Sequence, residues 1–366
     1  MIKTIDLFAG CGGLSVGFHK AGFLVDTAVE YDKQIAASFI QNHPGTRMII
    51  DDIKNVDNEQ IFSHRCADVI IGGPPCQGFS MAGARIRKNA FLDDPRNHLF
   101  KHYFNIVRIV DPKVFVIENV KGIATLQGGA ILNEIKRLFE DPDNFNGKPY
   151  KVQYRIVRAK ELGIPQDRER MIIFGTKADI DIDEEFKKTK QEIRLSLPNF
   201  FEATTVWDAI SNLPSPTEDG YIKQLKPQTA YQRFLSDSAE TYNHTASKHK
   251  ESIRARMKRI KPDENFTQLN ESINSIHSGS YGRLNPNKTA PTITTRFDTP
   301  SGGRFTHPYE DRTLTPREAA RIQSFPDSFK FVGTKSSICK QIGNAVPPKL
   351  AYFLAITIRR IINENK

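Results

Sequence analysis

An apolar run at residues 67–71 leads directly into the turn Gly72-Gly73-Pro74-Pro75-Cys76. Such a run is typical of a buried parallel strand, so Cys76 would lie just beyond the carboxyl end of that strand. Ligands bind at this edge in open α/β sheets. Two consecutive prolines fix the backbone and would hold the thiol rigidly. A nucleophile and a buried structural cysteine both fit Cys76 at this point.

The amino-terminal segment has the pattern of a strand, a glycine-rich turn and a helix. Residues 3–8 form the strand, residues 9–14 the turn, and the helical pattern runs to Gly22. Glycines let a ligand approach the backbone, and a helix amino end favours a negative group. The next strand, residues 24–29, ends at Glu30, an acid suited to a ribose hydroxyl pair. Ser15 stands where a dinucleotide fingerprint needs glycine, so one nucleoside with a short charged tail, such as S-adenosylmethionine (SAM), fits better. Other nucleotides remain an alternative.

Acids follow two further strand ends. Asp52 comes after the strand at residues 47–50 and could bind an adenine amino group or cap a helix. A strand is expected at residues 114–120, and its apolar residues 114–117 lead directly to Glu118. Apolar surroundings raise the pKa of a carboxyl. Cys76 and Glu118 would then pair as nucleophile and general acid, unless Glu118 caps the next helix.

Paired arginines precede a later strand. Arg168 and Arg170 are two residues apart, so they point to one face, where one could reach the active site while the other ties down structure. Ordinary surface salt bridges are the alternative. The polar loop after Cys76 carries Arg85 and Arg87 and lacks a hydrophobic period, which predicts a lid over a polyanion.

Length and charge limit the class of protein. A chain of 366 residues predicts two domains or one domain with an insertion, and its net charge of +10 is compatible with a polyanionic partner. Residues 221–262 concentrate the charge, with a core that includes Arg254, Arg256 and Arg259, although a solvated helix face would look similar. We expect a cytoplasmic protein, since the sequence shows neither a membrane span nor a secretory signal. Four scattered cysteines predict no metal site.

Periodicity weakens after residue 176 and returns near the carboxyl terminus. The sequence therefore predicts a smaller, loop-rich domain. Thr315 as N-cap, Pro316 at the first helical position and Glu318 in a capping box predict a helix that ends before Pro326. The apolar residues 350–362 predict a closing helix that packs back on the first domain.

Six segments in linear order resemble the cytosine-5 DNA methyltransferase family: Asp6-Leu7-Phe8-Ala9-Gly10-Cys11-Gly12-Gly13, Gly73-Pro74-Pro75-Cys76-Gln77, Glu118-Asn119-Val120, Gln166-Asp167-Arg168-Glu169-Arg170, Arg317-Glu318-Ala319-Ala320-Arg321-Ile322-Gln323 and Gly343-Asn344-Ala345-Val346. The resemblance implies the α/β SAM-dependent methyltransferase fold, a mostly parallel seven-stranded sheet with its last strand antiparallel. Residues 1–180 and 335–366 would form the catalytic domain. Residues 181–334 would form a small domain whose target-recognition region spans about 185–280, with DNA between the two.

The resemblance also implies a mechanism in which Cys76 attacks carbon 6 of a flipped cytosine. Glu118 would assist at ring nitrogen 3, Arg170 would bind the cytosine carbonyl, and Arg168 would support the site. Gln77 would lie near the flipped sugar, and Arg85 and Arg87 would contact DNA. The resemblance places the following residues in the SAM pocket: Phe8, Gly10, Cys11, Gly13, Glu30, Tyr31, Asp52, Ile53, Pro75, Leu99 and Asn344.

Three rival functions fit the sequence less well. A tRNA cytosine-5 methyltransferase shares the fold, but the Cys-Phe-Thr tripeptide of those relatives is absent. A non-catalytic DNA-binding relative is disfavoured by the intact Cys76, Glu118 and Arg170, and a nicotinamide dehydrogenase by the glycine spacing. Family habit predicts a monomeric bacterial modification enzyme that acts on double-stranded DNA and is paired with a restriction endonuclease.

Overall fold

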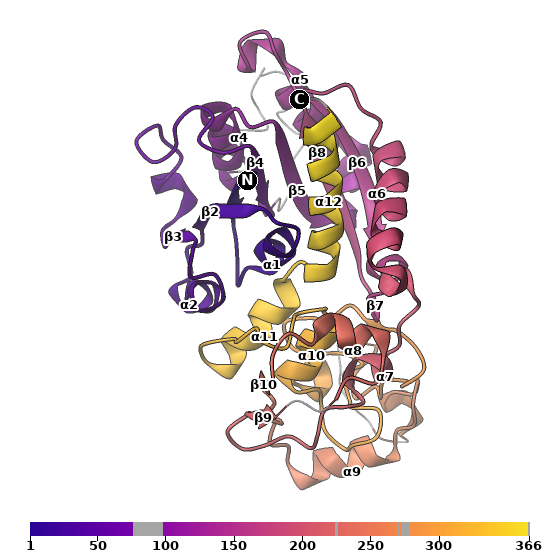
Figure 1. Ribbon diagram of the computed structural model, residues 1–366. Coiled ribbons are helices and arrows are strands. Elements are labelled where there is room, and N and C mark those ends of the chain that lie inside the picture. The colour runs from indigo at the N-terminus through magenta and orange to yellow at the C-terminus, as the bar shows by residue number, and fades with distance from the viewer. Residues whose placement is uncertain (76–97, 224–225, 270, 272–277, 365–366) are drawn as a thin grey trace.

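The computed structural model describes residues 1–75, 98–223, 226–269, 271 and 278–364 (Figure 1). A seven-stranded sheet organises the amino-terminal half, with strand order β3-β2-β1-β4-β5-β8-β6. Only β8 runs antiparallel to its neighbours, β5 and β6, so the predicted sheet and its antiparallel last strand are confirmed. The strands are β1 (Lys3–Leu7), β2 (Leu24–Val29), β3 (Arg47–Ile49), β4 (Val69–Gly72), β5 (Val114–Val120), β6 (Lys151–Arg158) and β8 (Glu169–Thr176).

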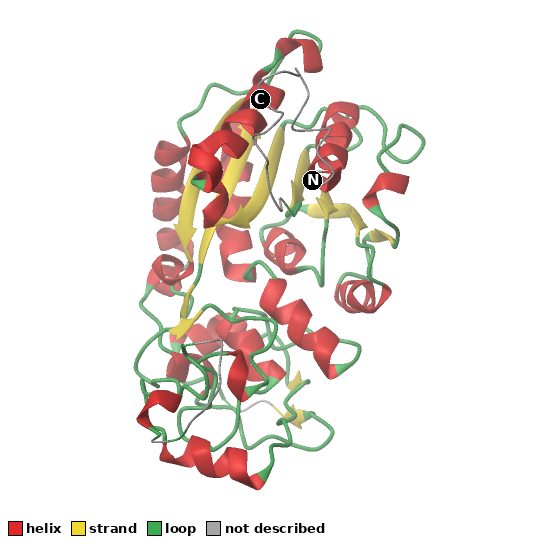
Figure 2. Ribbon diagram, turned by 180° about the vertical axis from the view of Figure 1, so that it is seen from behind, coloured by secondary structure: helices red, strands yellow, loops and turns green. Residues whose placement is uncertain are grey.

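Helices cover both faces of this sheet because its central strands are apolar on each side. One face carries α1 (Gly13–Lys20), α6 (Ile182–Ser196) and α12 (Pro348–Glu364), which lie in front of the sheet in Figure 1. The other face carries α4 (His98–Val110) and α5 (Ala130–Glu140), seen from behind in Figure 2. The closing helix α12 packs along α1, as predicted. The helix α2 (Lys33–Asn42) lies beside β2 and β3.

Helix α6 was not predicted as a helix. Its residues belong to the stretch expected to be loop-rich, yet they form a helix of 15 residues that packs on α12. Asp181 caps it by accepting a hydrogen bond from the Asp183 amide (2.8 Å), and three acids occupy its first turn. Ile182 and Ile193 are buried in the core beneath the sheet. Its strongly polar outer face masked this narrow apolar stripe in the sequence.

The part of the chain between α6 and α12 forms a smaller unit with its own apolar core. Its elements are α7 (Val206–Ile210), β9 (Ile222–Lys223), α8 (Ala230–Leu235), β10 (Glu240–Thr241), α9 (Glu251–Arg259), β11 (Ala290–Pro291), α10 (Pro316–Ile322) and α11 (Lys335–Asn344). The strand β11 pairs in parallel with β7 (Gln166–Asp167), which links this unit to the sheet. Helix α11, expected in the catalytic domain, contributes Ile338, Cys339 and Ile342 to the core of the smaller unit.

Short 3-10 helices occupy many connections. They are η1 (Ile53–Asn55), η3 (Lys121–Ala124), η4 (Leu126–Gly129), η5 (Pro142–Asn144), η6 (Ala159–Leu162), η7 (Pro198–Phe201), η8 (Phe266–Gln268) and η9 (Pro300–Gly302). Among the described helices, none is long and apolar enough to cross a membrane.

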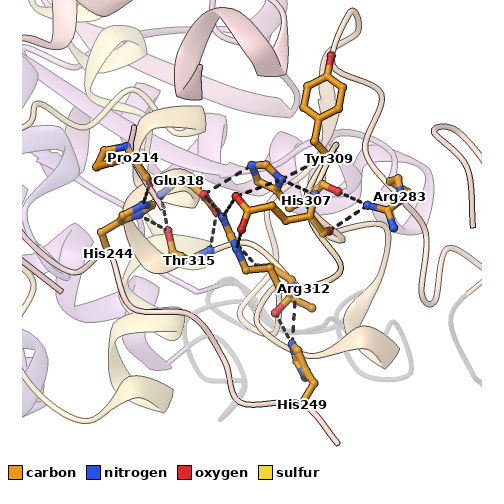
Figure 3. A network of polar contacts seen from close by, with 11 residues as sticks. Pro214, His244, His249, Arg283, His307, Tyr309, Arg312, Thr315 and Glu318 are labelled. Atoms are coloured by element: carbon orange, nitrogen blue, oxygen red, sulfur yellow. Dashed lines mark hydrogen bonds and ion pairs between the residues drawn. The ribbon is translucent and has the colours of Figure 1, made fainter. Parts of the chain in front are cut away.

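A buried polar network holds the smaller unit together around the start of α10 (Figure 3). The predicted capping box is present, because Thr315 and Glu318 exchange side-chain-to-backbone hydrogen bonds (3.1 and 2.8 Å). Arg312 donates to both carboxylate oxygens of Glu318 (2.9 and 2.8 Å), and His244 contacts the Thr315 hydroxyl (2.9 Å). Side chains bonded to one another and to backbone therefore take the place of long regular elements here.

Candidate active site at the carboxyl edge of the sheet

Polar groups line the carboxyl edge of the sheet in strand order. The glycine turn, Glu30 and Asp52 follow β1, β2 and β3, and the turn toward Cys76 follows β4, which lies between β1 and β5. The parallel register aligns Gly72, the last residue of β4, with Ile117 of β5, so Glu118 lies just beyond the point where β4 ends. Pro75 is the last described residue of this turn, and Cys76 follows it in the chain. Cys76, Gln77, Arg85 and Arg87 all lie outside the described residues.

Glu118 and Arg170 form a buried ion pair next to that turn. Arg170 Nε lies 2.8 Å from Glu118 Oε1, and the two side chains are 14% and 12% exposed. The antiparallel register of β5 and β8 brings them together, because Arg170 is opposite Val120 and Glu118 is opposite Ile172. Burial raises the pKa of the Glu118 carboxyl, while the positive charges of Arg170 and Arg168 oppose the shift. The following helix η3 has Val120 as its N-cap, so Glu118 does not cap it.

Asn119 joins the Glu118 strand to the turn that precedes Cys76. Its amide Nδ2 donates to the Pro74 carbonyl (2.9 Å). Gly73 packs closely here, since a Cβ at that position would lie 3.2 Å from Glu118 Oε2. The sequence reasoning assigned Asn119 no role, although a polar side chain directly after the Glu118 position was the available signal.

Arg168 lies beneath the site and is buried. Its guanidinium donates to the carbonyls of Gly343 (3.1 Å from both terminal nitrogens), Ala345 (3.0 Å) and Ile293 (3.3 Å). Burial and the nearby Arg170 lower its pKa to about 9. Arg168 therefore links the start of β8 to the smaller unit, and Arg170 contacts Glu118. Neither arginine forms an ordinary surface salt bridge, so that alternative is wrong.

The glycine turn after β1 is shaped by close contacts. A Cβ on Gly12 (φ +98°) would lie 2.4 Å from His43 Nε2, and one on Gly13 would lie 2.3 Å from the Val346 carbonyl oxygen. Gly10 has open space around its Cβ position, so the backbone is accessible there. Phe8, just before the turn, adopts φ +59°, a conformation rare for a residue with a large side chain.

Glu30 is tied to this turn. Its carboxylate accepts the Gly10 amide (3.0 Å) and the Asp32 amide (2.9 Å), while burial raises its pKa. The adjacent residue Tyr31 is 73% exposed. An acid anchored beside an accessible glycine backbone and an exposed aromatic residue next to it are groups of the kind that nucleoside sites use.

The remaining residues of the expected pocket have different settings. Asp52 accepts the Lys54 amide (3.2 Å) and thus caps η1, the plainer of its two expected roles. Ile53 is buried and Leu99 packs on the core beside it, whereas Asn344 is exposed at the end of α11 and Pro75 is half-buried. The Cys11 thiol is buried against the Gln341 carbonyl (3.7 Å), and burial raises its pKa to about 12, so it stays protonated.

Asp6, under the glycine turn, is a buried carboxyl group to which the sequence alone assigns no role. Ser15 donates to its Oδ2 (2.6 Å), and Oδ1 has no hydrogen-bond partner in the described part of the chain. Burial raises its pKa to about 7, against the Ser15 hydrogen bond. Its strand position was visible in the sequence, but its burial depends on helix α1 packing over it.

The basic helix α9 lies far from this edge. Figures 1 and 2 both place it at the end of the smaller unit most distant from the sheet. Arg256 and Arg259 both contact Glu271, which lies outside the helix, while Arg254 lies 3.8 Å from Glu251 and keeps a side chain 58% exposed. Of the three expected DNA contacts on α9, Arg254 is the least engaged by carboxylates.

Comparisons with known proteins agree with the ordered motifs. The chain matches the C-5 cytosine-specific DNA methylase family over residues 2–360. Type II methyltransferase M.DdeI of Desulfomicrobium norvegicum is 35% identical over 97% of this chain and 88% of its own length. Type II methyltransferase M1.HphI of Haemophilus parahaemolyticus is 33% identical over 100% of this chain and 88% of its own.

Solved structures agree on the fold. A prophage-encoded E. coli protein described as a DNA modification methyltransferase has a TM-score of 0.75 at 28% identity, covering 99% of this chain and all of its own. The methyltransferase Dnmt2 of S. pombe, at 15% identity and a TM-score of 0.61 over all of both chains, shares the fold. The family resemblance read from the motifs is thus confirmed, and the chain belongs to the C-5 cytosine-specific DNA methylase family as a DNA cytosine-5 methyltransferase.

Proposed function

We propose that the enzyme transfers a methyl group from SAM to carbon 5 of a flipped cytosine in a specific double-stranded DNA sequence, through a covalent Cys76 adduct. One observation carries the proposal. The buried Glu118–Arg170 pair is joined through Asn119 to Pro74, two residues before Cys76 in the chain. This linkage supports Glu118 as general acid and Arg170 as the cation that act together with the Cys76 thiolate.

The proposed reaction uses the chain's groups in a fixed order. The Cys76 thiolate bonds to carbon 6 while Glu118 gives a proton to ring nitrogen 3, which makes carbon 5 nucleophilic. Arg170 holds the cytosine carbonyl. Bound SAM supplies the methyl group that carbon 5 takes up. Loss of the carbon 5 proton to water, cleavage of the bond between the Cys76 sulfur and carbon 6, and return of the nitrogen 3 proton to Glu118 then restore the ring and the enzyme.

The residues around the glycine turn fit SAM. Each Glu30 oxygen accepts one amide, and a carboxylate oxygen can accept a second hydrogen bond, so capacity remains for two ribose hydroxyls. The exposed Tyr31 ring offers an adenine a stacking face, with Asp52 and Ile53 at its edge. Phe8, Gly10, Cys11 and Gly13 would line the tail of the ligand, and Pro75, Leu99 and Asn344 would complete the pocket.

The target carbon is inaccessible inside a duplex, so the cytosine must leave the base stack at a cost of a few kcal/mol. DNA would lie between the catalytic domain and the smaller unit, with Gln77, Arg85 and Arg87 on the catalytic side. We place the target-recognition region within residues of about 185–280, in the part that follows α6, since α6 packs on α12 against the sheet. As a modification enzyme of a bacterial restriction system, the protein would act as a cytoplasmic monomer and protect host DNA from a partner endonuclease.

Transfer of a radiolabelled methyl group tests the proposal. Purified protein with labelled SAM should label duplex DNA and leave tRNA unlabelled. Cys76→Ala should abolish labelling while SAM binding by calorimetry persists, because Cys76 is needed only for the bond to carbon 6. Near-normal turnover in Cys76→Ala would reject the covalent mechanism, and labelling of tRNA in place of DNA would reject the substrate.

A further inference from the structure

A groove of about 720 Å³ opens beside the Glu118–Arg170 pair and has no role in the reaction described above. One wall comes from the carboxyl ends of β5 and β6 and the start of β8, and the other from β11 and the residue after it. The lining residues are Val120, Lys121, Arg158, Lys160, Asp167, Glu169, Arg170, Pro291 and Thr292. Four of them are positive and two are negative, so the groove carries net positive charge.

The cations of this groove are only loosely engaged by its acids. Lys121 and Arg158 share the Glu169 carboxylate, Arg158 also lies 3.8 Å from the exposed Glu161, and Lys160 Nζ lies 2.8 Å from Asp167 Oδ1. Their side chains are 61%, 54% and 46% exposed in that order. Exposed pairs of this kind contribute little to stability, and a single carboxylate cannot accept from every donor of two cations. A phosphate can therefore bind these cations at little cost.

We propose that this groove holds the sugar–phosphate backbone beside the flipped cytosine, with Lys121, Arg158 and Lys160 as phosphate contacts. The inference rests on the proposed function, because the flipped base at Arg170 is what brings the strand to this place. Exposed Val120 would face a deoxyribose, while Arg170 itself stays with the base. Such contacts fix the position of the strand and carry no sequence information.

Salt-dependent binding of the full-length enzyme to a short fluorescein-labelled duplex tests the inference. The duplex contains the sequence that bisulfite sequencing identifies as methylated, or a duplex of mixed sequence is used before that sequence is identified. Lys121→Gln, Arg158→Gln and Lys160→Gln should each weaken binding by about 3- to 10-fold and lower the slope of log affinity against log salt by about 1. Matched controls exist at the opposite ends of the same strands.

Lys113 and Lys151 are those controls. Lys113 precedes β5 and pairs with Asp68 (2.9 Å), and Lys151 begins β6 and pairs with Asp179 (2.5 Å). Their Gln variants should leave both affinity and slope unchanged. Unchanged slopes in all three groove variants, or equal losses in the controls, would overturn the inference.

Glu169→Gln adds a test with the opposite sign. Removing its negative charge should strengthen DNA binding, because Lys121 and Arg158 are released and the repulsion of phosphate falls. If these cations serve only as structural partners of Glu169, DNA binding stays unchanged while the melting temperature drops, and the inference fails. A protein with groove-dependent slopes but no methyl transfer would retain this inference and reject the proposed function.

Discussion

At the scale of single residues, the Glu118 carboxyl is under two opposing influences. Burial favours its protonated form, and the Arg170 guanidinium at 2.8 Å favours its ionised form and fixes its orientation. Burial is the larger effect, so the pKa is raised. Such a carboxyl can keep a proton nearer to neutral pH than a free glutamate and deliver it to a base that binds beside it.

Glu118→Gln should therefore lower kcat by about 10²- to 10⁴-fold while DNA affinity changes little. The wild-type rate should fall as pH rises through the raised pKa of Glu118, because the acid must be protonated, and the variant should lack this fall. Single-turnover methyl transfer across a pH series measures both effects. A variant that keeps either the wild-type rate or its high-pH decline would contradict this role.

Asn119→Ala should act through position alone. The variant loses the hydrogen bond to the Pro74 carbonyl, so the turn that precedes Cys76 is free to shift. A displacement near 1 Å costs about 10²-fold in rate, and we expect a kcat loss of about 10- to 100-fold with unchanged KM for DNA and SAM. Asn144→Ala is the matched control, because Asn144 likewise donates to a carbonyl, that of Leu138 (3.0 Å), away from the site. Equal kcat in the two variants would refute the positioning role.

Site residues that lie at the ends of strands could be predicted from the sequence. The contacts that these residues make in the folded chain could not. Glu30 and Glu118 follow apolar runs and were therefore visible. The partner of Glu118 was not fixed, because either Arg168 or Arg170 could have reached it until the register of β5 and β8 was known. The burial of Asp6 depends on how helix α1, which carries its partner Ser15, packs on the sheet. The hydrogen bond of Asn119 depends on Pro74, which is distant in the chain.

At the scale of elements, the sheet was predictable because its strands are continuous apolar runs. Strands β2 and β5 have the bounds that the sequence predicted, and α10 begins at its predicted cap. The smaller unit was unpredictable because buried arginines that donate to backbone carbonyls organise much of it. Arg283 and Arg317 each donate to three or more such carbonyls, a pattern without any sequence period.

The network at α10 should make the protein sensitive to acid. Burial opposes ionisation of Glu318, but the charge and hydrogen bonds of Arg312 outweigh it and lower its pKa to about 2. A carboxyl with a lowered folded pKa stabilises the fold above its unfolded value, about 4.5, and this contribution is lost as pH falls toward 2.

Glu318→Gln should therefore lower the free energy of unfolding at pH 7 by about 2–3 kcal/mol, since Arg312 loses its buried carboxylate partner and keeps only the half-exposed Glu310. The deficit relative to wild type should shrink as pH falls below about 4.5. Urea unfolding at pH 7, 5 and 3 measures it. The exposed Glu184→Gln should change stability by less than about 0.5 kcal/mol. A deficit that stays constant with pH would contradict the ionised state of Glu318.

At the scale of the whole molecule, the two parts of the chain meet under the active site. Gln166 in β7 contacts the Gln323 side chain (2.8 Å) and accepts the Ile293 amide (2.8 Å), next to the carbonyls that Arg168 holds. Fixed contacts at this junction set how the smaller unit faces the carboxyl edge of the sheet. We therefore propose that DNA recognised by the smaller unit is presented to Glu118 in one orientation.

The basic helix α9 tests how far DNA extends along the smaller unit. Arg254→Gln should weaken duplex binding and lower the salt slope, whereas Arg256→Gln and Arg259→Gln should have smaller effects because Glu271 already engages both. Lys187→Gln on the exposed face of α6 is the control, since Lys187 pairs with Glu184 on its own helix. Binding that is equally salt-dependent in Arg254→Gln and wild type would exclude α9 from the DNA interface.

Bisulfite sequencing of plasmid DNA from cells that express the enzyme tests the central claim most directly. Wild-type protein should protect one cytosine in a recurring sequence from conversion, and Cys76→Ala should protect none. Absence of protected cytosines with the wild-type protein, or the same protected cytosines with Cys76→Ala, would contradict Cys76-dependent methylation of carbon 5.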